Sequence, residues 1–457
     1  MSKKSQAMDS DSTGAALDDA PLAEAVQAAL AEASRQGASA AEAAASLGQG
    51  LSVNVRMGEV ETVEHTRDRG LVVSVYFGQC TGSASTSDYA PAAVREAVLA
   101  ACSIARYTQE DSCHGLADPE RLATDAMDLD LDLYHPWRPS VDEARDLALV
   151  CEDKALSADA RIDNSEGASV DAHEGCEVYG NTHGFIGYTR KSRQGISCSV
   201  IGTENGAMQR DYWYSAARRF GELDSAAEVG EQAAARTLRR LGSRRIPTCQ
   251  VPVIYEAPVA SSLLSHFIGA VSGGALYRKA TFLLDHLGKQ VFPEFVRIHE
   301  QPLLIGAMGS SSFDNEGVAT APRDIVSDGV LQSYVLGSYS ARRLEMETTG
   351  NAGGVHNLTI DSGEQDLEAL IKGIEKGLLV TELIGFGVNT VTGDYSRGVS
   401  GLWIENGEIV HPVEEVTVAG NLKDIFSNIV AVGNDVDPRR NIRCGSIRVD
   451  GLTIAGE

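Results

Sequence analysis

The sequence lacks a long apolar run. Residues 251–260 are among its most hydrophobic stretches, and even these include Glu256. A helix that crosses a membrane needs about 20 consecutive, mainly apolar residues. We therefore expect no membrane-spanning helix.

Basic residues are also scarce. The chain has 39 Lys and Arg against 64 Asp and Glu, which gives a formal net charge of −25 at pH 7. Such a charge repels the phosphate backbone of nucleic acids. We therefore expect no direct binding of DNA or RNA.

The eight cysteines include no CxxC pair and no short repeating spacing. Residues 1–20 are polar and lack the apolar segment of a secretion signal. Disulfides are rare in the reducing environment of the cytoplasm. The sequence predicts a cytoplasmic protein whose cysteines are free thiols.

The composition is that of a globular protein long enough for two or three domains, because 43% of its 457 residues are hydrophobic and 23% are charged. Residues 1–20 have no periodicity and predict a mobile tail. The region 242–248, GSRRIPT, is polar and holds both Gly and Pro, which is typical of a domain boundary. We therefore predict an N-terminal domain over residues 21–241, with sub-parts of about 21–127 and 128–241, and a C-terminal domain over residues 242–457.

In the N-terminal domain, the hydrophobic pattern predicts both helices and an antiparallel sheet. Ser140 and Glu143 form a capping-box pattern at the start of one helix. Apolar residues at helical spacing predict helices over residues 21–45 (interrupted near Gly37), 91–105, 141–156 and 225–241. Alternating and β-branched residues predict strands over residues 51–55 and 71–77, and an antiparallel meander over 161–217.

The C-terminal domain is predicted to be rich in β-structure. The chain holds 46 glycines, about one residue in ten, against a usual share of about 7%. This excess suits many tight turns between strands. We predict strands over residues 250–255, 329–339, 401–409 and 446–455, with a helix over 259–271, and the whole chain is assigned to the α+β class.

A search for catalytic motifs finds no HExxH, GxSxG or GxxxxGK[ST] pattern. The densest group of potential metal ligands is His173, Glu174, Cys176 and His183, which we interpret as exposed polar residues of a hairpin because neighbouring residues of a strand point to opposite faces. Asp314, Asn315 and Glu316 could offer oxygen ligands to a cation, but a capped turn is the simpler interpretation.

Cys444, in the segment NIRCGS, is a candidate nucleophile if a His and an acid lie beside it in space. Sequence alone does not place those groups, and a buried Cys at the start of a strand is the commoner case. Both interpretations stay open at this point.

Several ordered motifs carry a resemblance to a known family. The N-terminal marker is the stretch 56–88, which ends in GSASTSD. The C-terminal markers are GVL at 329–331 with Tyr334, TGN at 349–351, GDYSRG at 393–398, AGNL at 419–422 and NIRCGS at 441–446. The chain resembles the PmbA/TldE branch of the TldD/PmbA family, also called the modulator of DNA gyrase family, from its first helix to its C-terminus.

The resemblance implies a lost zinc site. In the sister branch, TldD, a helix carries HExxxH, whose two His bind zinc and whose Glu activates a metal-bound water. Alignment on Leu263 and Leu264 places Ser265 and Ala270 at the His positions and His266 at the Glu position. His266 is one residue, or about 100° of helix rotation, away from the first ligand position. We therefore expect no catalytic residue and no metal ligand on this chain.

The resulting hypothesis is a metal-free subunit of a heterodimeric metallopeptidase whose zinc is bound by a TldD-type partner. The family resemblance implies that such a pair cleaves unfolded or extended peptides, including leader regions of modified peptides and antitoxins. An extended peptide could bind by main-chain hydrogen bonds along a sheet edge. Besides the degenerate helix, Arg278, Asn421 and Cys444 are the residues that we expect near the cleft or the subunit contact.

Three alternatives remain open at the level of sequence. The chain could be a self-sufficient metallopeptidase with zinc held by displaced groups such as His266, His286 or Cys444. It could be a regulatory interaction protein without a part in proteolysis. It could also be a thiol-dependent hydrolase built on Cys444.

Overall fold

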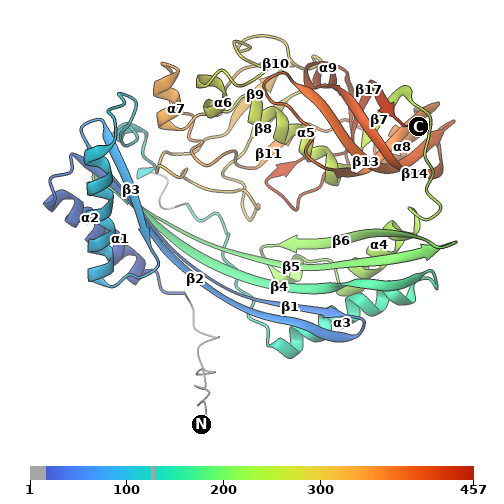
Figure 1. Ribbon diagram of the computed structural model, residues 1–457, viewed down its shortest axis with the longest axis horizontal. Coiled ribbons are helices and arrows are strands. Elements are labelled where there is room, and N and C mark those ends of the chain that lie inside the picture. Colours follow the sequence, from blue (N-terminus) through green and yellow to red (C-terminus); the bar gives the residue numbers. More distant parts are fainter. Residues whose placement is uncertain (1–16, 125–128, 457) are drawn as a thin grey trace.

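The computed structural model describes residues 17–124 and 129–456 (Figure 1). The N-terminal region forms a long, curled sheet with helices packed against it, and the C-terminal region lies across its concave side as a second, β-rich layer. This arrangement confirms the predicted α+β class. Within the described residues, no helix is both long and apolar enough to cross a membrane.

The N-terminal sheet is antiparallel and has the strand order β3-β2-β1-β4-β5-β6. Helices α1 and α2 share a hydrophobic core with one end of the sheet, and α3 and α4 share a separate core with the other end. The strands are β1 (Ala40–Arg56), β2 (Glu59–Phe77), β3 (Cys80–Thr86), β4 (Ile162–Asn181), β5 (Ile186–Glu204) and β6 (Ala207–Ala217). The helices are α1 (Ala20–Arg35), α2 (Pro91–Tyr107), α3 (Val141–Ser157) and α4 (Ala226–Leu238).

The first predicted helix is too long. Helix α1 ends at Arg35, Gly37 adopts a left-handed φ of 82°, and residues 40–45 belong to strand β1. Alanine favours helices, but Ala41, Ala43 and Ala45 alternate with less buried residues and pair with β2, and Ala43 and Ala45 also pair with β4. Burial between two neighbouring strands outweighs the local preference of these alanines.

The predicted tail over residues 1–20 lies largely outside the described residues, because the structure describes the chain from residue 17. Two of its last residues, Leu17 and Asp19, contact the rest of the fold. Leu17 is only 4% exposed, Asp19 forms an ion pair of 2.8 Å with Arg190, and Ala20 begins α1. Leu17 and Asp19 are therefore not free of the fold, and the rest of the predicted tail lies outside the described residues or is exposed.

The capping box at the start of α3 is confirmed. The Ser140 hydroxyl accepts a hydrogen bond from the Glu143 amide, and the Glu143 carboxylate accepts one from the Ser140 amide. Helix α4 begins with the same arrangement at Ser225 and Glu228. Each box satisfies backbone donors that the first turn of a helix leaves free.

The C-terminal region contains a closed barrel. Strands β14, β13, β12, β7 and β17 follow one another in a sheet, and an additional pairing between β14 and β17 closes it. Strand β15 extends the sheet beside β17. The bounds are β7 (Cys249–Tyr255), β12 (Lys376–Ile384), β13 (Asp394–Glu405), β14 (Glu408–Asn421), β15 (Ile429–Val432) and β17 (Ile447–Ala455).

A second sheet in this region has the order β10-β9-β8-β11-β16. The predicted strand over residues 329–339 is mostly wrong, because only two of these residues form β10 and α7 begins at Ser338. The strands are β8 (Ile298–Glu300), β9 (Arg323–Ser327), β10 (Val330–Leu331), β11 (Leu358–Ile360) and β16 (Ile442–Arg443). The helices are α5 (Ala257–Ala270), α6 (Gly273–Tyr277), α7 (Ser338–Arg343), α8 (Leu367–Lys372) and α9 (Leu422–Ser427).

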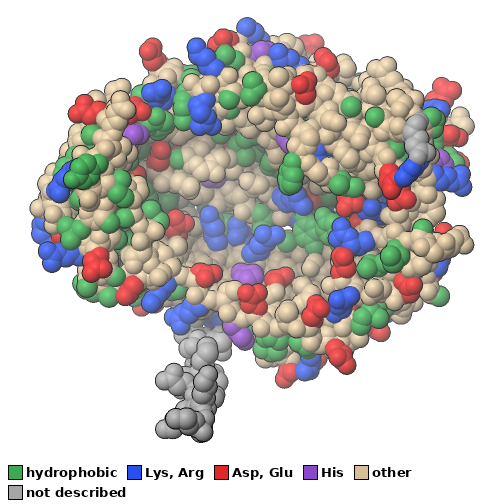
Figure 2. Space-filling model, in the orientation of Figure 1, with side chains coloured by type: hydrophobic (Ala, Val, Ile, Leu, Met, Phe, Trp, Pro, Cys, Tyr) green, Lys and Arg blue, Asp and Glu red, His purple; other side chains and the backbone are tan. Residues whose placement is uncertain are grey.

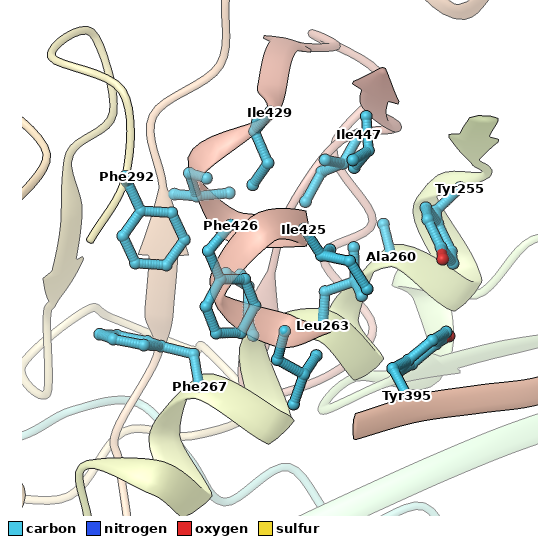
Figure 3. Packing of buried hydrophobic residues seen from close by; sticks show 14 of the residues in the cluster. Tyr255, Ala260, Leu263, Phe267, Phe292, Tyr395, Ile425, Phe426, Ile429 and Ile447 are labelled. Carbon is cyan, nitrogen blue, oxygen red and sulfur yellow. The ribbon is translucent and has the colours of Figure 1, made fainter. Parts of the chain in front are cut away.

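Helix α5 is held in the largest hydrophobic core of the described chain. Phe267 of α5 packs edge-on against Phe292 and Phe426, with ring centroids 5.0 and 5.9 Å apart (Figure 3). Leu263, one turn earlier, is buried in the same core. Burying side chains of this size contributes about 1.5–3 kcal/mol each. Packing therefore fixes the rotation of α5 and decides which of its residues face outward.

Buried ion pairs join the two regions. Arg236 and Arg239, at the end of α4, both bind Glu256, the N-cap residue of α5, at 2.9 and 3.0 Å. Arg240 reaches Glu382 on β12 at 2.7 Å. These contacts tie the segment that starts the C-terminal region to the last helix of the N-terminal region.

Candidate functional site

The three positions that the sequence comparison predicts to correspond to the zinc motif lie near the C-terminal end of α5 and have different environments. Ser265 is exposed, and its hydroxyl donates to the Ser261 carbonyl at 3.0 Å. Ala270 is 0% exposed in the core, and its carbonyl accepts a hydrogen bond from the Thr281 hydroxyl at 2.7 Å. The two positions therefore do not face a common space that could hold an ion.

His266 is half-buried and is the one imidazole on α5. Its Nε2 atom is buried without a hydrogen-bond partner among the described residues. The ring lies edge-on to Tyr395, with centroids 6.1 Å apart. Burial, with a smaller contribution from the positive charge of Arg397, lowers the pKa of His266. A neutral imidazole is therefore favoured at pH 7.

The residues present do not fit a zinc ion. Among the described residues, no group of three His, Cys, Asp or Glu side chains is arranged to hold a metal. Cys444 contacts the Ala257 carbonyl at the start of α5, with Sγ 3.9 Å away. His266 lies nine residues further on, about 13 Å along the helix axis. His286 instead has its Nδ1 atom 2.7 Å from the Leu284 carbonyl.

Cys444 is fully buried within this chain, so its thiol is not exposed to a cleft or to a partner, unlike the sequence expectation. Burial raises the pKa of its thiol to about 12. Thiolates, not thiols, are the reactive form of cysteine. This environment is the opposite of the one that an activated nucleophile needs.

We expect Cys444 to resist alkylation in the native protein. At pH 8, iodoacetamide should modify it at least about a hundredfold more slowly than the partly exposed Cys80, because so little of its thiol is ionised or accessible. Peptide mass spectrometry after timed labelling measures both rates. Equal rates would contradict the buried thiol and revive the thiol-hydrolase alternative.

Among the described residues, no contact joins Arg278 to Asn421, and the two side chains have different partners. Arg278 is exposed and donates to the hydroxyl of the adjacent Tyr277 at 3.1 Å. Asn421 caps α9 and donates to the Thr392 carbonyl at 3.1 Å. Gly393 has a φ of 85°, and a Cβ atom there would approach the Asn421 side chain to 2.8 Å. Asn421 thus holds the turn before β13.

The group at residues 173–183 is only partly exposed, which corrects the sequence interpretation. His173 lies on the surface of β4, but Glu174 and Cys176 are buried. Arg138 binds the Glu174 carboxylate at 2.6 Å, and this ion pair fixes the segment before α3 to the sheet. No local sequence pattern predicts the ion pair between Arg138 and Glu174, because the two residues are far apart in the chain.

Asp314 forms the predicted capped turn. Its Oδ1 atom accepts hydrogen bonds from the Glu316 and Val318 amides at 2.9 and 3.0 Å, and Oδ2 accepts one from the Ala352 amide at 2.8 Å. Burial nevertheless raises the pKa of Asp314 to about 6.

This pKa predicts a pH dependence of stability. A carboxyl with a raised pKa in the folded state contributes stability that is fully present below its unfolded pKa of about 3.8 and is lost as the pH rises through about 6. The free energy of unfolding of the wild type, relative to Asp314→Asn, should therefore fall by roughly 2–3 kcal/mol from pH 4 to pH 7. Denaturant titrations at several pH values measure it. The exposed Asp153→Asn serves as control, and a pH-independent difference for Asp314→Asn would contradict the expectation.

The structure reveals a cavity that the sequence did not indicate. It has a volume of about 600 Å³ and lies between β5, β6 and loops of the C-terminal region. Figure 2 shows the hollow between the two layers, with Lys and Arg side chains gathered on its wall. The cationic residues that line it are Lys191, Arg193, Arg439 and Arg440, with His356 beside them. These residues are distant in sequence, so no motif could have predicted their meeting.

Comparison with known proteins finds matches over most of the chain. The PmbA/TldA metallopeptidase domain 1, central domain and C-terminal domain match residues 41–105, 134–241 and 248–456. Metalloprotease PmbA of Escherichia coli O157:H7 is 49% identical over 95% of this chain and 96% of its own length.

Two solved structures resemble this one. A crystal structure from Bacteroides thetaiotaomicron, described as a candidate modulator of DNA gyrase, has a TM-score of 0.90 and 30% identity, and the match covers 95% of this chain and 99% of that one. TldE of Thermococcus kodakarensis has a TM-score of 0.80 over 94% of this chain and all of its own, but at 19% identity it shows the fold alone. From the matches to its three domains and to its 49%-identical relative, the chain belongs to the PmbA/TldD metallopeptidase family.

Proposed function

We propose that this chain is the metal-free subunit of a heterodimeric metallopeptidase and that a TldD-type partner binds the zinc. The observation that supports this most strongly is the state of α5. Its motif positions hold an exposed Ser265, a half-buried His266 and a fully buried Ala270. A catalytic zinc site needs about three protein ligands that converge on one point.

The proposed substrates are unfolded or extended peptides, including leader regions of modified peptides and antitoxins. The long sheet of the N-terminal region offers main-chain groups along its edge strands, β3 and β6, to which an extended peptide could add. Main-chain recognition places few demands on side chains, so low sequence specificity follows from it. The proposed location of the pair is the cytoplasm.

Reconstitution with the partner tests this function. The purified chain alone should leave a fluorogenic unfolded peptide intact, and a TldD-type subunit from the same organism should cleave it only after this chain is added. Chelation of zinc should abolish that activity. Cleavage by the isolated chain, or a partner whose rate is unaffected by this chain, would contradict the proposal, and the second result would favour a regulatory interaction protein.

A substitution at His266 separates the proposal from the self-sufficient metallopeptidase. If His266 is not a ligand, His266→Ala should leave the activity of the reconstituted pair within about twofold. A displaced zinc ligand would instead lose most of the activity when it is removed, as is usual when a ligand of a catalytic metal is lost.

A further inference from the structure

The cavity between the two regions is positively charged in a chain that is strongly acidic overall. Four Lys and Arg side chains line it, and none of its described lining residues is Asp or Glu. The whole chain has 64 acidic and 39 basic residues. This local excess of positive charge is therefore not a consequence of composition.

Two cations of the cavity share one face of strand β5. Lys191 and Arg193 are separated by one residue, so their side chains leave the sheet on the same side. Among the described residues, no carboxylate lies within ion-pair distance of either. Burial, followed by the charge of Arg218, lowers the pKa of Lys191, and the opposite charge of Glu177 offsets this only in part.

The opposite wall comes from the C-terminal region. Arg440 donates to the hydroxyl of Tyr214 at 3.0 Å and has no ion pair within the described chain, whereas Arg439 is paired with Asp437 at 2.8 Å. The Nε2 atom of His356 is buried and lacks a hydrogen-bond partner in the described structure. Lys191 is half-buried, whereas Arg193 and Arg440 are exposed. Cations that converge on one space repel one another. An anion between the two walls would offset that repulsion.

The shape of the space favours a peptide over a compact inorganic anion. A second cavity, of about 330 Å³, adjoins the first and shares Arg193 and Tyr214 with it. It follows the sheet along residues 194–197 of β5, and its lining also includes Asp171 and His173 of β4, so the cationic part of the space lies in the first cavity. Together the two cavities form a trough beside extended strands, and their volumes fall in the range of small-ligand and peptide pockets.

We propose that this trough binds a carboxylate of an extended peptide, with Lys191 and Arg193 on one wall and Arg440 on the other. The carboxylate is either the C-terminus of the peptide or an Asp or Glu side chain, since both present the same two oxygens to guanidinium groups. The choice of a peptide as the ligand rests on the proposed function.

Isothermal titration calorimetry of three unlabelled, N-acetylated pentapeptides with the isolated full-length chain tests the proposal. One has uncharged side chains and a free C-terminal carboxylate, the second is the same peptide ended by a carboxamide, and the third carries an internal Asp and a carboxamide end. At low salt, the first or the third should bind at least about tenfold more tightly than the second, and which one does so identifies the source of the carboxylate. Equal binding of all three would overturn the proposal, as would pyrophosphate that binds more tightly than either charged peptide.

The double variant Lys191→Met/Arg193→Met should remove the preference for the charged peptide. Neither side chain has an ion-pair partner in the described structure, so no carboxylate is left unpaired, and thermal melting checks the fold. Arg193→Gln alone should weaken binding in the same direction. Lys289 is exposed and does not line the cavity. The control variant Lys289→Met should therefore bind the peptides like the wild type. An unchanged preference in the double variant would overturn the assignment to this trough.

This test is independent of the reconstitution experiment. If the isolated chain selects carboxylates but the partner cleaves peptides equally well without it, only the proposed function is contradicted. If cleavage depends on this chain but the chain shows no carboxylate preference, only the proposed binding trough is contradicted.

Discussion

Glu256→Gln is expected to lower the free energy of unfolding by about 3–5 kcal/mol. Glu256 is buried and accepts bonds from Arg236 and from both terminal nitrogens of Arg239, at 2.9 to 3.1 Å. Neutralising it leaves Arg236, itself buried, without its closest counter-charge, although Asp211 remains 3.4 Å away. The change therefore acts at the junction between α4 and α5, where the two regions meet.

The sign of the pH dependence follows from the same contacts. Burial alone would raise the pKa of Glu256, but Arg239 and Arg236 outweigh it and hold the pKa below its ordinary value. The stability that Glu256 contributes is thus present above pH of about 4.5 and is lost as the pH falls through the lowered pKa. Urea titrations at pH 7 and at acidic pH measure both effects.

The matched control is Glu368→Gln. Glu368 pairs with Lys372 on the exposed surface of α8 at 2.7 Å. Exposed pairs contribute about 0–1 kcal/mol, so this variant should resemble the wild type. If Glu368→Gln and Glu256→Gln lowered the free energy of unfolding by similar amounts, the ion pairs of Glu256 with Arg236 and Arg239 would not stabilise the junction of the two regions.

Ala270→His is expected to destabilise the chain by about 3 kcal/mol or more. Ala270 is 0% exposed and lies in the core that contains Leu264 and Phe267. An imidazole there must displace packed side chains and bury polar nitrogens, and each effect costs about 1–3 kcal/mol. Restoring a family ligand at this position is therefore incompatible with the present packing of α5.

Ser265→His provides the comparison for that variant. Ser265 is the other position that we predict to correspond to a ligand, but it is exposed, so the same side chain should change stability by less than about 0.5 kcal/mol. Thermal and chemical unfolding of the two variants distinguish the positions. Equal stability of both would mean that α5 can rotate or relax enough to rebuild a metal site, and that its packing does not fix its outward face.

Local chemistry made much of the fold predictable. The capping box of Ser140 and Glu143 identified the start of α3, and the boundaries of α2 and α5 followed from apolar spacing to within two residues. The alanines at 40–45 led to a wrong helix prediction. Their burial depends on pairing with β2 and β4, which lie elsewhere in the sequence and leave no local pattern. The short β10 and the start of α7 were missed for the same reason.

The candidate site was only half visible from the sequence. The altered motif positions on α5 could be located by resemblance, but the burial of Ala270 and Cys444 depends on the surrounding core. The cationic trough could not be predicted at all, because β5 meets the 439–441 loop only through the folding of the second layer over the sheet.

The zinc content of the isolated chain distinguishes a metal-free subunit from a self-sufficient metallopeptidase in one experiment. The full-length protein would be expressed with ample zinc, purified without a chelating tag, and analysed by elemental mass spectrometry. We expect close to zero zinc per chain for the protein alone, and about one zinc per heterodimer after assembly with its TldD-type partner. About one zinc bound per isolated chain would contradict the metal-free assignment and would show that displaced ligands, with His266 the first to test, form a metal site on this subunit.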